Sequence, residues 1–359
     1  MLQIPRLETA QIRSTLKLAY IDSFSLLQPE ERPKKYTTLL AIHGVGFNSA
    51  VFSTLIPHLP SNTRLLAYNQ RSYRGSSPAF KGKEQGGSDT TARYLEDFLE
   101  FVQWCVRELG LTSKEQGGQV IVLGWSKGTV IPISLLALLN SCSDSKSSVP
   151  PFSSFLRYLS SSTLSLAQSL VSSHISSLIL FEPPGSAFSR PPTRDFLTSM
   201  SSVLPPNDKN VTREEWALAF ANWVGGYRES RNELEERQVL EKSRLEDFDE
   251  ELLEEGWQWE CVDHGFEWTL AGEKEDIRRV GELAVRGENG ELGVGILYGS
   301  RTVEYFEETV EMIREWWTED REVGRKKVIE SVEGTNHFGF VHKPEEFMKA
   351  LFDCFDKFS

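Results

Sequence analysis

Short apolar segments alternate with amphipathic segments along most of the chain. The apolar segments are β-prone and lie at residues 15–21, 37–42, 64–68, 120–123, 178–181, 294–298 and 327–332. Between them, apolar positions recur at helical spacing over residues 90–109, 303–317 and 344–355. Strands that alternate with helices form mostly parallel sheets covered on both faces, so we expect a doubly wound α/β fold.

The alternation is interrupted after Phe181, where charged segments such as residues 233–255 are mixed with large aromatic residues. Charged outer faces and aromatic inner faces are typical of helices that cover an apolar cavity. We therefore expect a helical cap at residues 184–292, inserted between core segments at residues 1–183 and 293–359. Two interpretations of the aromatic residues stay open: they line a cavity, or they pack the cap onto its base.

The composition is typical of a globular protein, with 39% hydrophobic and 25% charged residues. A formal net charge of −13 disfavours a nucleic-acid partner, because phosphate binding needs a positive face. The N-terminal residues lack the apolar core of a signal peptide, and no apolar run suits stable membrane insertion, so we expect a cytoplasmic protein. The serine-rich residues 141–148 are expected to form a surface excursion. The four scattered cysteines are expected to be reduced thiols, with no metal-site spacing: Cys105, Cys142, Cys261 and Cys354.

The sequence Gly-Trp-Ser-Lys-Gly at residues 124–128 follows one apolar run and precedes another. A strand, a sharp turn and a helix in this order would place the Ser126 hydroxyl at the tip of a strained turn. The Gly-x-Ser-x-Gly pattern alone is weak, because chance would produce it in roughly one such chain in five. Its context must therefore decide whether Ser126 is a nucleophile.

A serine nucleophile needs a base, usually a histidine that a carboxylate orients. In a strand-turn-helix hydrolase, the chain order is serine, acid, histidine. Of the six histidines, His337 follows the last expected strand in a Gly-x-Asn-His sequence, which makes it the preferred base. His342 lies close by in the sequence and is the alternative.

These motifs resemble the α/β-hydrolase fold superfamily, most closely the cap-bearing members found widely in fungi. The resemblance spans nearly all of the chain and rests on residues 43–46, 69–77, 124–128, 334–337 and 344–347. It implies that the backbone N–H groups of Val45 and Lys127 bind the oxyanion. It also implies that His43 shapes the His-Gly loop and takes no part in the chemistry.

The acid departs from the family pattern, in which an aspartate usually follows the next-to-last strand as Gly-x-x-Asp. Here Thr302 stands at that position, and Glu304 lies two residues later. The family also uses the end of the strand after the nucleophile helix, where Glu182 follows four apolar residues and precedes two prolines. We assign Glu182 as the acid and keep Glu304 as the alternative.

The expected activity is that of a serine hydrolase that cleaves a carboxylic ester, thioester or lactone through an acyl-enzyme on Ser126. The substrate is a small acyl compound with an apolar acyl or alcohol part, and no metal or organic cofactor is implied. One alternative keeps the site but makes the protein an acyltransferase, cyclase or C–C bond hydrolase of a biosynthetic pathway. The other is a receptor or binding protein that uses the capped cavity without turnover.

Overall fold

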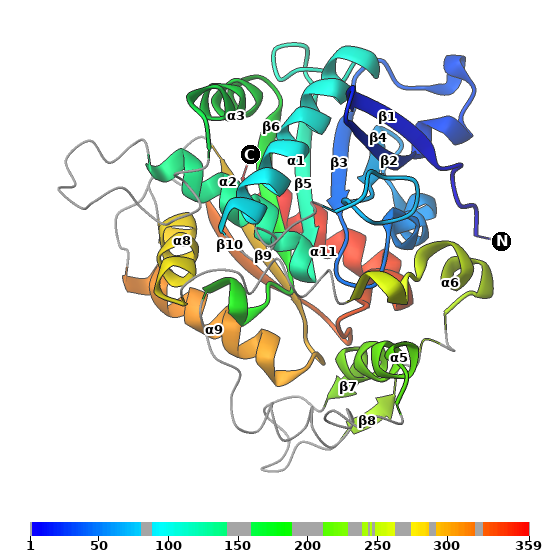
Figure 1. The fold of residues 1–359 in the computed structure, drawn as a ribbon, viewed down its shortest axis with the longest axis vertical. Helices are drawn as coiled ribbons and strands as arrows, with labels where there is room; N and C mark the ends of the chain where they lie inside the picture. The colour runs from blue at the N-terminus through cyan, green and yellow to red at the C-terminus, as the bar shows by residue number, and fades with distance from the viewer. Residues whose placement is uncertain are drawn as a thin grey trace.

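A computed structural model describes residues 2–79, 88–141, 159–188, 211–228, 239–242, 245, 248–262, 274–286, 292–319 and 326–358. Its centre is an eight-stranded sheet with the order β1-β2-β4-β3-β5-β6-β9-β10, seen at the middle of Figure 1. Cys142, residues 142–148 of the serine-rich segment, and Phe266 and Trp268, two of the aromatic residues of the expected cap, lie outside the described residues. The described cysteines Cys105, Cys261 and Cys354 are buried free thiols.

The sheet is parallel except at its N-terminal edge. From β3 to β10 neighbouring strands pair in parallel, whereas β1 pairs antiparallel with β2 and β2 with β4. The mostly parallel α/β sheet predicted from the alternation is therefore confirmed. The strands are β1 Glu8–Arg13, β2 Leu16–Asp22, β3 Thr37–Ile42, β4 Thr63–Tyr68, β5 Gln119–Trp125, β6 Ile175–Phe181, β9 Gly293–Gly299 and β10 Lys327–Val332.

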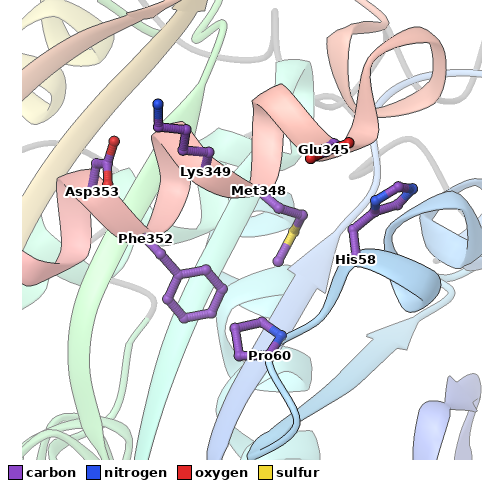
Figure 2. A pocket seen from close by; sticks show the side chains of 7 residues that line it. All are labelled: His58, Pro60, Glu345, Met348, Lys349, Phe352 and Asp353. Carbon is purple, nitrogen blue, oxygen red and sulfur yellow. The ribbon is translucent and has the colours of Figure 1, made fainter.

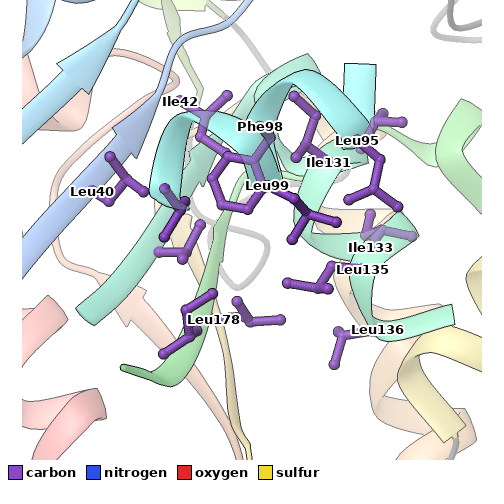
Figure 3. Packing of buried hydrophobic residues seen from close by; sticks show 14 of the residues in the cluster. Leu40, Ile42, Leu95, Phe98, Leu99, Ile131, Ile133, Leu135, Leu136 and Leu178 are labelled. Atoms are coloured by element: carbon purple, nitrogen blue, oxygen red, sulfur yellow. The ribbon is translucent and has the colours of Figure 1, made fainter. Parts of the chain in front are cut away.

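One face of the sheet is covered by helices α1 Ser88–Glu108, α2 Val130–Ser141 and α3 Ser161–Ser173, with α9 Glu304–Glu319 beside β9. Alternate residues of the buried strands point to this face, and Figure 3 shows Leu40 and Ile42 in one apolar cluster with Phe98. Helix α2 has apolar residues on all sides because it lies between the sheet and other helices. In the described part of the chain, every helix is too short or too polar to cross a bilayer.

The opposite face of the sheet packs against the 3-10 helix η3 Ser49–His58 and against α11 Pro344–Asp356. Strand residues such as Leu39 and Ala41 belong to this second core, one position out of register with those of the first. This alternation follows from the period of two in a strand. Both faces of the sheet are therefore covered by apolar side chains. The polar residues that follow the strands lie at the edge of the sheet, where they can form a site.

The interval after β6 combines short helices with a small sheet: η7 Gly185–Phe188, α5 Arg213–Val224, β7 Gly226–Arg228, β8 Val239–Lys242, α6 Glu250–Gly256, η9 Trp259–Cys261 and α8 Lys274–Arg286. The helix expected over residues 233–255 is wrong at β8, which pairs antiparallel with β7. Its four residues are too few to show a clear alternation of apolar and polar positions.

Helix α8, the last of this interval, packs on the core helix α2. The Asn140 side chain donates a hydrogen bond to the main-chain oxygen of Leu283 at 2.7 Å, and Ala284 and Val285 belong to the first core cluster. The structure therefore places α8 in the helical layer of the core. Between β6 and α8, the segment around α6 contacts the loop that follows β3.

Candidate active site

The carboxyl ends of the central parallel strands meet at one edge of the sheet. Strand β3 leads to His43, β5 to Ser126, β6 to Glu182, and β10 to the loop that carries His337. Open α/β sheets bind their ligands at this edge, because the loops that follow the strands converge there. The residues singled out from the sequence thus gather on neighbouring strands.

Ser126 lies in a sharp turn between β5 and a short 3-10 helix, η5 Ser126–Thr129, that continues into α2. Its φ is 53°, a left-handed conformation that is costly for a residue with a β-carbon. The Thr129 hydroxyl donates a hydrogen bond to the Ser126 main-chain oxygen at 2.6 Å, which holds the turn closed. The predicted strand-turn-helix arrangement is therefore present around this serine.

The two glycines of the turn are needed because other backbone passes through the space of a side chain. A β-carbon on Gly124 would lie 2.7 Å from the Thr129 α-carbon. One on Gly128 would lie 2.3 Å from the main-chain oxygen of Ile42, on the neighbouring strand β3. The glycines of Gly-x-Ser-x-Gly thus allow the turn to pack directly on the sheet.

His337 and Glu182 form a buried pair. Nδ1 of His337 lies 2.7 Å from Oε2 of Glu182, and the two residues are 3% and 0% exposed. Because a carboxylate only accepts hydrogen bonds, Nδ1 carries the proton of this contact, and Nε2 of the neutral ring is an acceptor. Glu304, the alternative acid, is the half-buried first residue of α9.

Glu182 is held at the end of β6 by its backbone and by both carboxylate oxygens. Its φ is 52°, and its N–H continues the sheet ladder to the Leu297 oxygen at 2.9 Å. Oε1 accepts from the Gly299 N–H at 2.8 Å, and Oε2 accepts from the Thr302 hydroxyl at 2.6 Å. The contact of Thr302 could not be predicted, because the sequence shows only a threonine where the family pattern has an acid.

His337 is fixed by two further aromatic residues that the sequence did not single out for this purpose. The Trp125 indole N–H donates to the His337 main-chain oxygen at 3.0 Å, so the residue before the serine also holds the histidine loop. The Phe306 ring stacks on the imidazole with centroids 4.4 Å apart and an interplanar angle of 14°. The imidazole plane is thus constrained by packing and by hydrogen bonding.

His43 is fully buried beneath the loop that follows β3. Its Nε2 accepts a hydrogen bond from the Gln70 N–H at 3.0 Å, and its Nδ1 lies 2.9 Å from the Gly44 oxygen. Burial lowers its pKa to about 4, so the ring is neutral near pH 7 and donates through Nδ1. This geometry supports the expectation that His43 shapes the loop.

The loop that carries Val45 packs directly on the serine turn. A β-carbon on Gly44 would lie 3.1 Å from the Ser126 β-carbon, so a side chain there would crowd the serine. Val45 is half-buried, and Lys127, which follows the serine, is 5% exposed. Lys127 thus follows Ser126 in the turn, and Val45 follows Gly44, which packs on that turn.

The segment around α6 is hydrogen-bonded to this same loop. The Gln258 N–H donates to the Gly46 oxygen at 2.7 Å, and the Asn48 N–H donates to the Gly256 oxygen at 2.8 Å. Gly46 has a φ of 77°, and a β-carbon there would lie 2.7 Å from the Trp257 ring. This part of the insertion is therefore a fixed neighbour of the loop.

Aromatic residues of the insertion pack on aromatic residues of the core. Trp257 lies 4.8 Å from Phe47, and Phe248 lies 5.1 Å from Phe338, between ring centroids. Of the two interpretations of the aromatic residues, packing onto the base therefore holds for Phe248 and Trp257. His342, the alternative base, ends α10 Gly339–His342 with its ring edge-on to Phe248 at 5.1 Å.

A groove of about 530 Å³ lies elsewhere, between the end of η3 and α11 (Figure 2). None of its lining residues belongs to the candidate site: His58, Pro60, Glu345, Met348, Lys349, Phe352 and Asp353.

Within the described ranges, no three His, Cys, Asp or Glu residues are grouped so that they could hold a metal ion.

Comparison with known proteins gives the class of protein to which this fold and its strand-turn-helix serine belong. A model of the alpha/beta hydrolase family matches residues 39–350, and the chain belongs to this family. The protein is therefore an α/β hydrolase. No curated protein sequence matches the chain significantly.

Solved structures of similar fold span almost the whole chain. The epoxide hydrolase CorEH is 14% identical, with 99% of each chain covered and a TM-score of 0.55. A lipase-esterase related protein from Clostridium acetobutylicum is 12% identical, covering 95% of this chain and 99% of that chain with a TM-score of 0.53. A bromoperoxidase from Bacillus anthracis is 16% identical, covering 98% and 100% with a TM-score of 0.51. At these identities the likeness shows the fold.

Proposed function

We propose that the protein is a serine hydrolase that cleaves carboxylic esters, thioesters or lactones through an acyl-enzyme on Ser126. The observation that carries the proposal is the buried 2.7 Å contact between Glu182, at the end of β6, and His337, whose loop is hydrogen-bonded to Trp125 beside the serine. A histidine oriented by a carboxylate is the group that a serine needs in order to lose its proton. Ser126 lies in a left-handed turn at the same edge of the sheet.

In the proposed reaction, the Ser126 oxygen attacks the substrate carbonyl while Nε2 of His337 takes the serine proton. The negative oxygen of the tetrahedral intermediate is bound by the N–H groups of Lys127 and Val45. Collapse of the intermediate breaks the bond to the leaving group, which receives the proton from His337. Water, deprotonated by His337, then attacks the acyl-enzyme and releases the acid and the serine. Glu182 stabilises the positively charged imidazole in both halves.

An apolar substrate is proposed because aromatic rings surround the histidine. Phe306 stacks on His337, and Phe338 lies 5.6 Å from it between ring centroids. Phe248 of the insertion packs on Phe338, and Trp257 packs on Phe47, which supports our proposal that the segment after β6 acts as a cap. The serine at the turn also favours ester chemistry over the aspartate-dependent reactions of related folds.

Labelling with a fluorophosphonate probe tests the function directly, because the probe reacts with an activated serine. We expect the folded wild type to be labelled and Ser126→Ala to take no label. Ser72→Ala is the matched control, since Ser72 is also half-buried and left-handed, with a φ of 70°. A folded wild-type protein that takes no label would contradict the proposal and favour a binding protein.

Product analysis then separates hydrolysis from transfer. With p-nitrophenyl butyrate and a large excess of an alcohol or amine, a hydrolase releases butyrate whatever acceptor is present. An acyltransferase forms the new ester or amide instead, although both share the acyl-enzyme on Ser126. Butyrate as the main product over a series of acceptors supports hydrolysis, and predominant transfer overturns it.

A further inference from the structure

The turn that follows β9 supplies two hydrogen-bond donors to one buried carboxylate. The Gly299 N–H donates to Oε1 of Glu182 at 2.8 Å, and the Thr302 hydroxyl donates to Oε2 at 2.6 Å. Glu182 and Thr302 are both 0% exposed. Oε2 also forms a hydrogen bond with Nδ1 of His337 at 2.7 Å, so two side chains contact this one oxygen.

This turn is itself tied to the loop that carries the histidine. The Arg301 N–H donates to the Thr335 oxygen at 2.8 Å, and the Gly334 N–H donates to the Ser300 hydroxyl at 2.7 Å. A β-carbon on Gly299 would lie 2.5 Å from the Thr335 oxygen, which shows how closely the two segments pass. The donors to Glu182 and the backbone before His337 therefore form one connected unit.

The direction of the Thr302 hydrogen bond follows from its partner. Glu182 lies against a histidine and two donors, and an ionised carboxylate has no hydrogen to give, so Thr302 is the donor. The last torsion of a glutamate side chain is broad, so a carboxylate held by fewer partners can rotate away from His337. Because Thr302 and Gly299 bind different oxygens, together they fix that rotation.

We propose that Thr302 is a positioning residue that holds Oε2 of Glu182 toward His337. It acts through Glu182 and does not touch the substrate, and the inference rests on the proposed function of Ser126, Glu182 and His337. The role is specific to the hydroxyl, because a side chain of the same shape without it leaves Oε2 with one donor fewer. The turn after β9 thus acts as a carboxylate-binding cradle for an acid carried by β6.

The test compares Thr302→Val with Thr302→Ser and with Thr309→Val. Thr309 is a matched control, since it is also 0% exposed but donates to the Tyr305 main-chain oxygen at 2.8 Å. We expect Thr302→Val to lower the rate constant of fluorophosphonate labelling about ten- to hundredfold, the range for a lost hydrogen bond to a charged group. Thr302→Ser should stay within about threefold of wild type, and so should Thr309→Val.

The pH profile of labelling separates positioning from a general structural role. Without the Thr302 hydroxyl, the charge on Glu182 is shared with one donor fewer, so protonated His337 is favoured. The acid-side midpoint of the labelling rate should therefore move to higher pH in Thr302→Val and return in Thr302→Ser. A Thr302→Val protein with the rate and midpoint of Thr309→Val would overturn the proposal.

Two further measurements keep the proposal testable. The first applies if Thr302→Val does not fold, and the second applies if the wild-type protein is not labelled. Thr302→Cys keeps a weak donor of similar size, and we expect a labelling rate clearly below wild type; an unchanged rate contradicts the role of the hydroxyl. If folded wild type takes no label, the proposed function fails by itself. The NMR signal of the Nδ1 proton of His337 then still decides, because positioning requires it to shift in Thr302→Val and not in Thr309→Val.

Discussion

Trp125 donates its indole N–H to the main-chain oxygen of His337 at 3.0 Å, with the two ring centroids 5.3 Å apart. The same residue immediately precedes Ser126 and is 1% exposed. Trp125 therefore links the candidate nucleophile directly to the loop of the candidate base. The variable second position of the Gly-x-Ser-x-Gly pattern carries that structural role in this chain.

Replacing Trp125 by Phe removes the indole N–H but keeps an aromatic ring, and we expect a loss in labelling rate of about tenfold or more. The cause is the His337 oxygen, which loses its donor in a buried setting; such a loss costs about 1–3 kcal/mol. Trp317→Phe is the control, because it removes a comparable bond to the Val285 oxygen at 2.9 Å. Equal rates for the two variants would show that Trp125 does not align the site.

Glu182→Gln should reduce the fluorophosphonate labelling rate by about 10³ to 10⁴, as expected when a triad acid loses its charge. The glutamine still fills the site but no longer stabilises the imidazolium of His337. Glu304→Gln, which changes the alternative acid, is expected to stay within about threefold of wild type. Second-order labelling rates at pH 7.5 measure both variants, and a loss of only a few-fold in Glu182→Gln would sink the assignment.

The fold was predictable where a strand is buried on both faces, because such a strand is a continuous apolar run in the sequence. The expected strand at residues 37–42 has the bounds of β3, because every residue of a central parallel strand except the first is buried. The edge strand β1 was missed, since its residues are mixed in polarity and mostly exposed or half-buried. The strand β8 was missed because its four residues lie within a charged segment that we expected to be helical.

The candidate site was predictable as far as chain order and strand ends determine it. Glu182 and His337 were paired from their places after expected strands, and the structure shows their side chains in contact. The contacts of Trp125, Phe306 and Thr302 were not predictable, because they depend on where side chains point across segments distant in sequence. Only the departure at Thr302 from the family pattern signalled that the acid is held differently.

His43 should make folding stability depend on pH in a defined window. Its pKa is lowered to about 4 by burial, below the ordinary value of 6.5, so between these pH values the unfolded chain binds a proton that the folded protein does not. The free energy of unfolding should therefore fall as pH drops from about 6.5 to about 4, by about 3 kcal/mol in total. At higher pH the ring is neutral in both states and contributes no slope.

Urea unfolding of wild type and His43→Gln between pH 4 and pH 7.5 measures this contribution. Glutamine retains an oxygen that can accept the Gln70 N–H and has no titration in this range. The difference in unfolding free energy between the two proteins should therefore change with pH, while the contribution of other groups cancels. Parallel pH profiles would contradict a depressed His43 pKa.

Gly128→Ala should prevent the serine turn from forming in its present place. The new β-carbon would lie 2.3 Å from the Ile42 oxygen and 2.7 Å from the His43 oxygen, both of them backbone atoms that cannot move without disturbing β3. We expect a loss of stability of about 3 kcal/mol or more, the scale of strong overpacking in a core, together with loss of fluorophosphonate labelling.

Gly110→Ala is the informative control, because Gly110 has a φ of 63° but no atom within 4 Å of its β-carbon position. That control should cost only about 1–2 kcal/mol, the price of a left-handed residue, and keep full labelling. Urea unfolding gives both stabilities, and a Gly128→Ala protein as stable as Gly110→Ala would show that the turn can move away from β3.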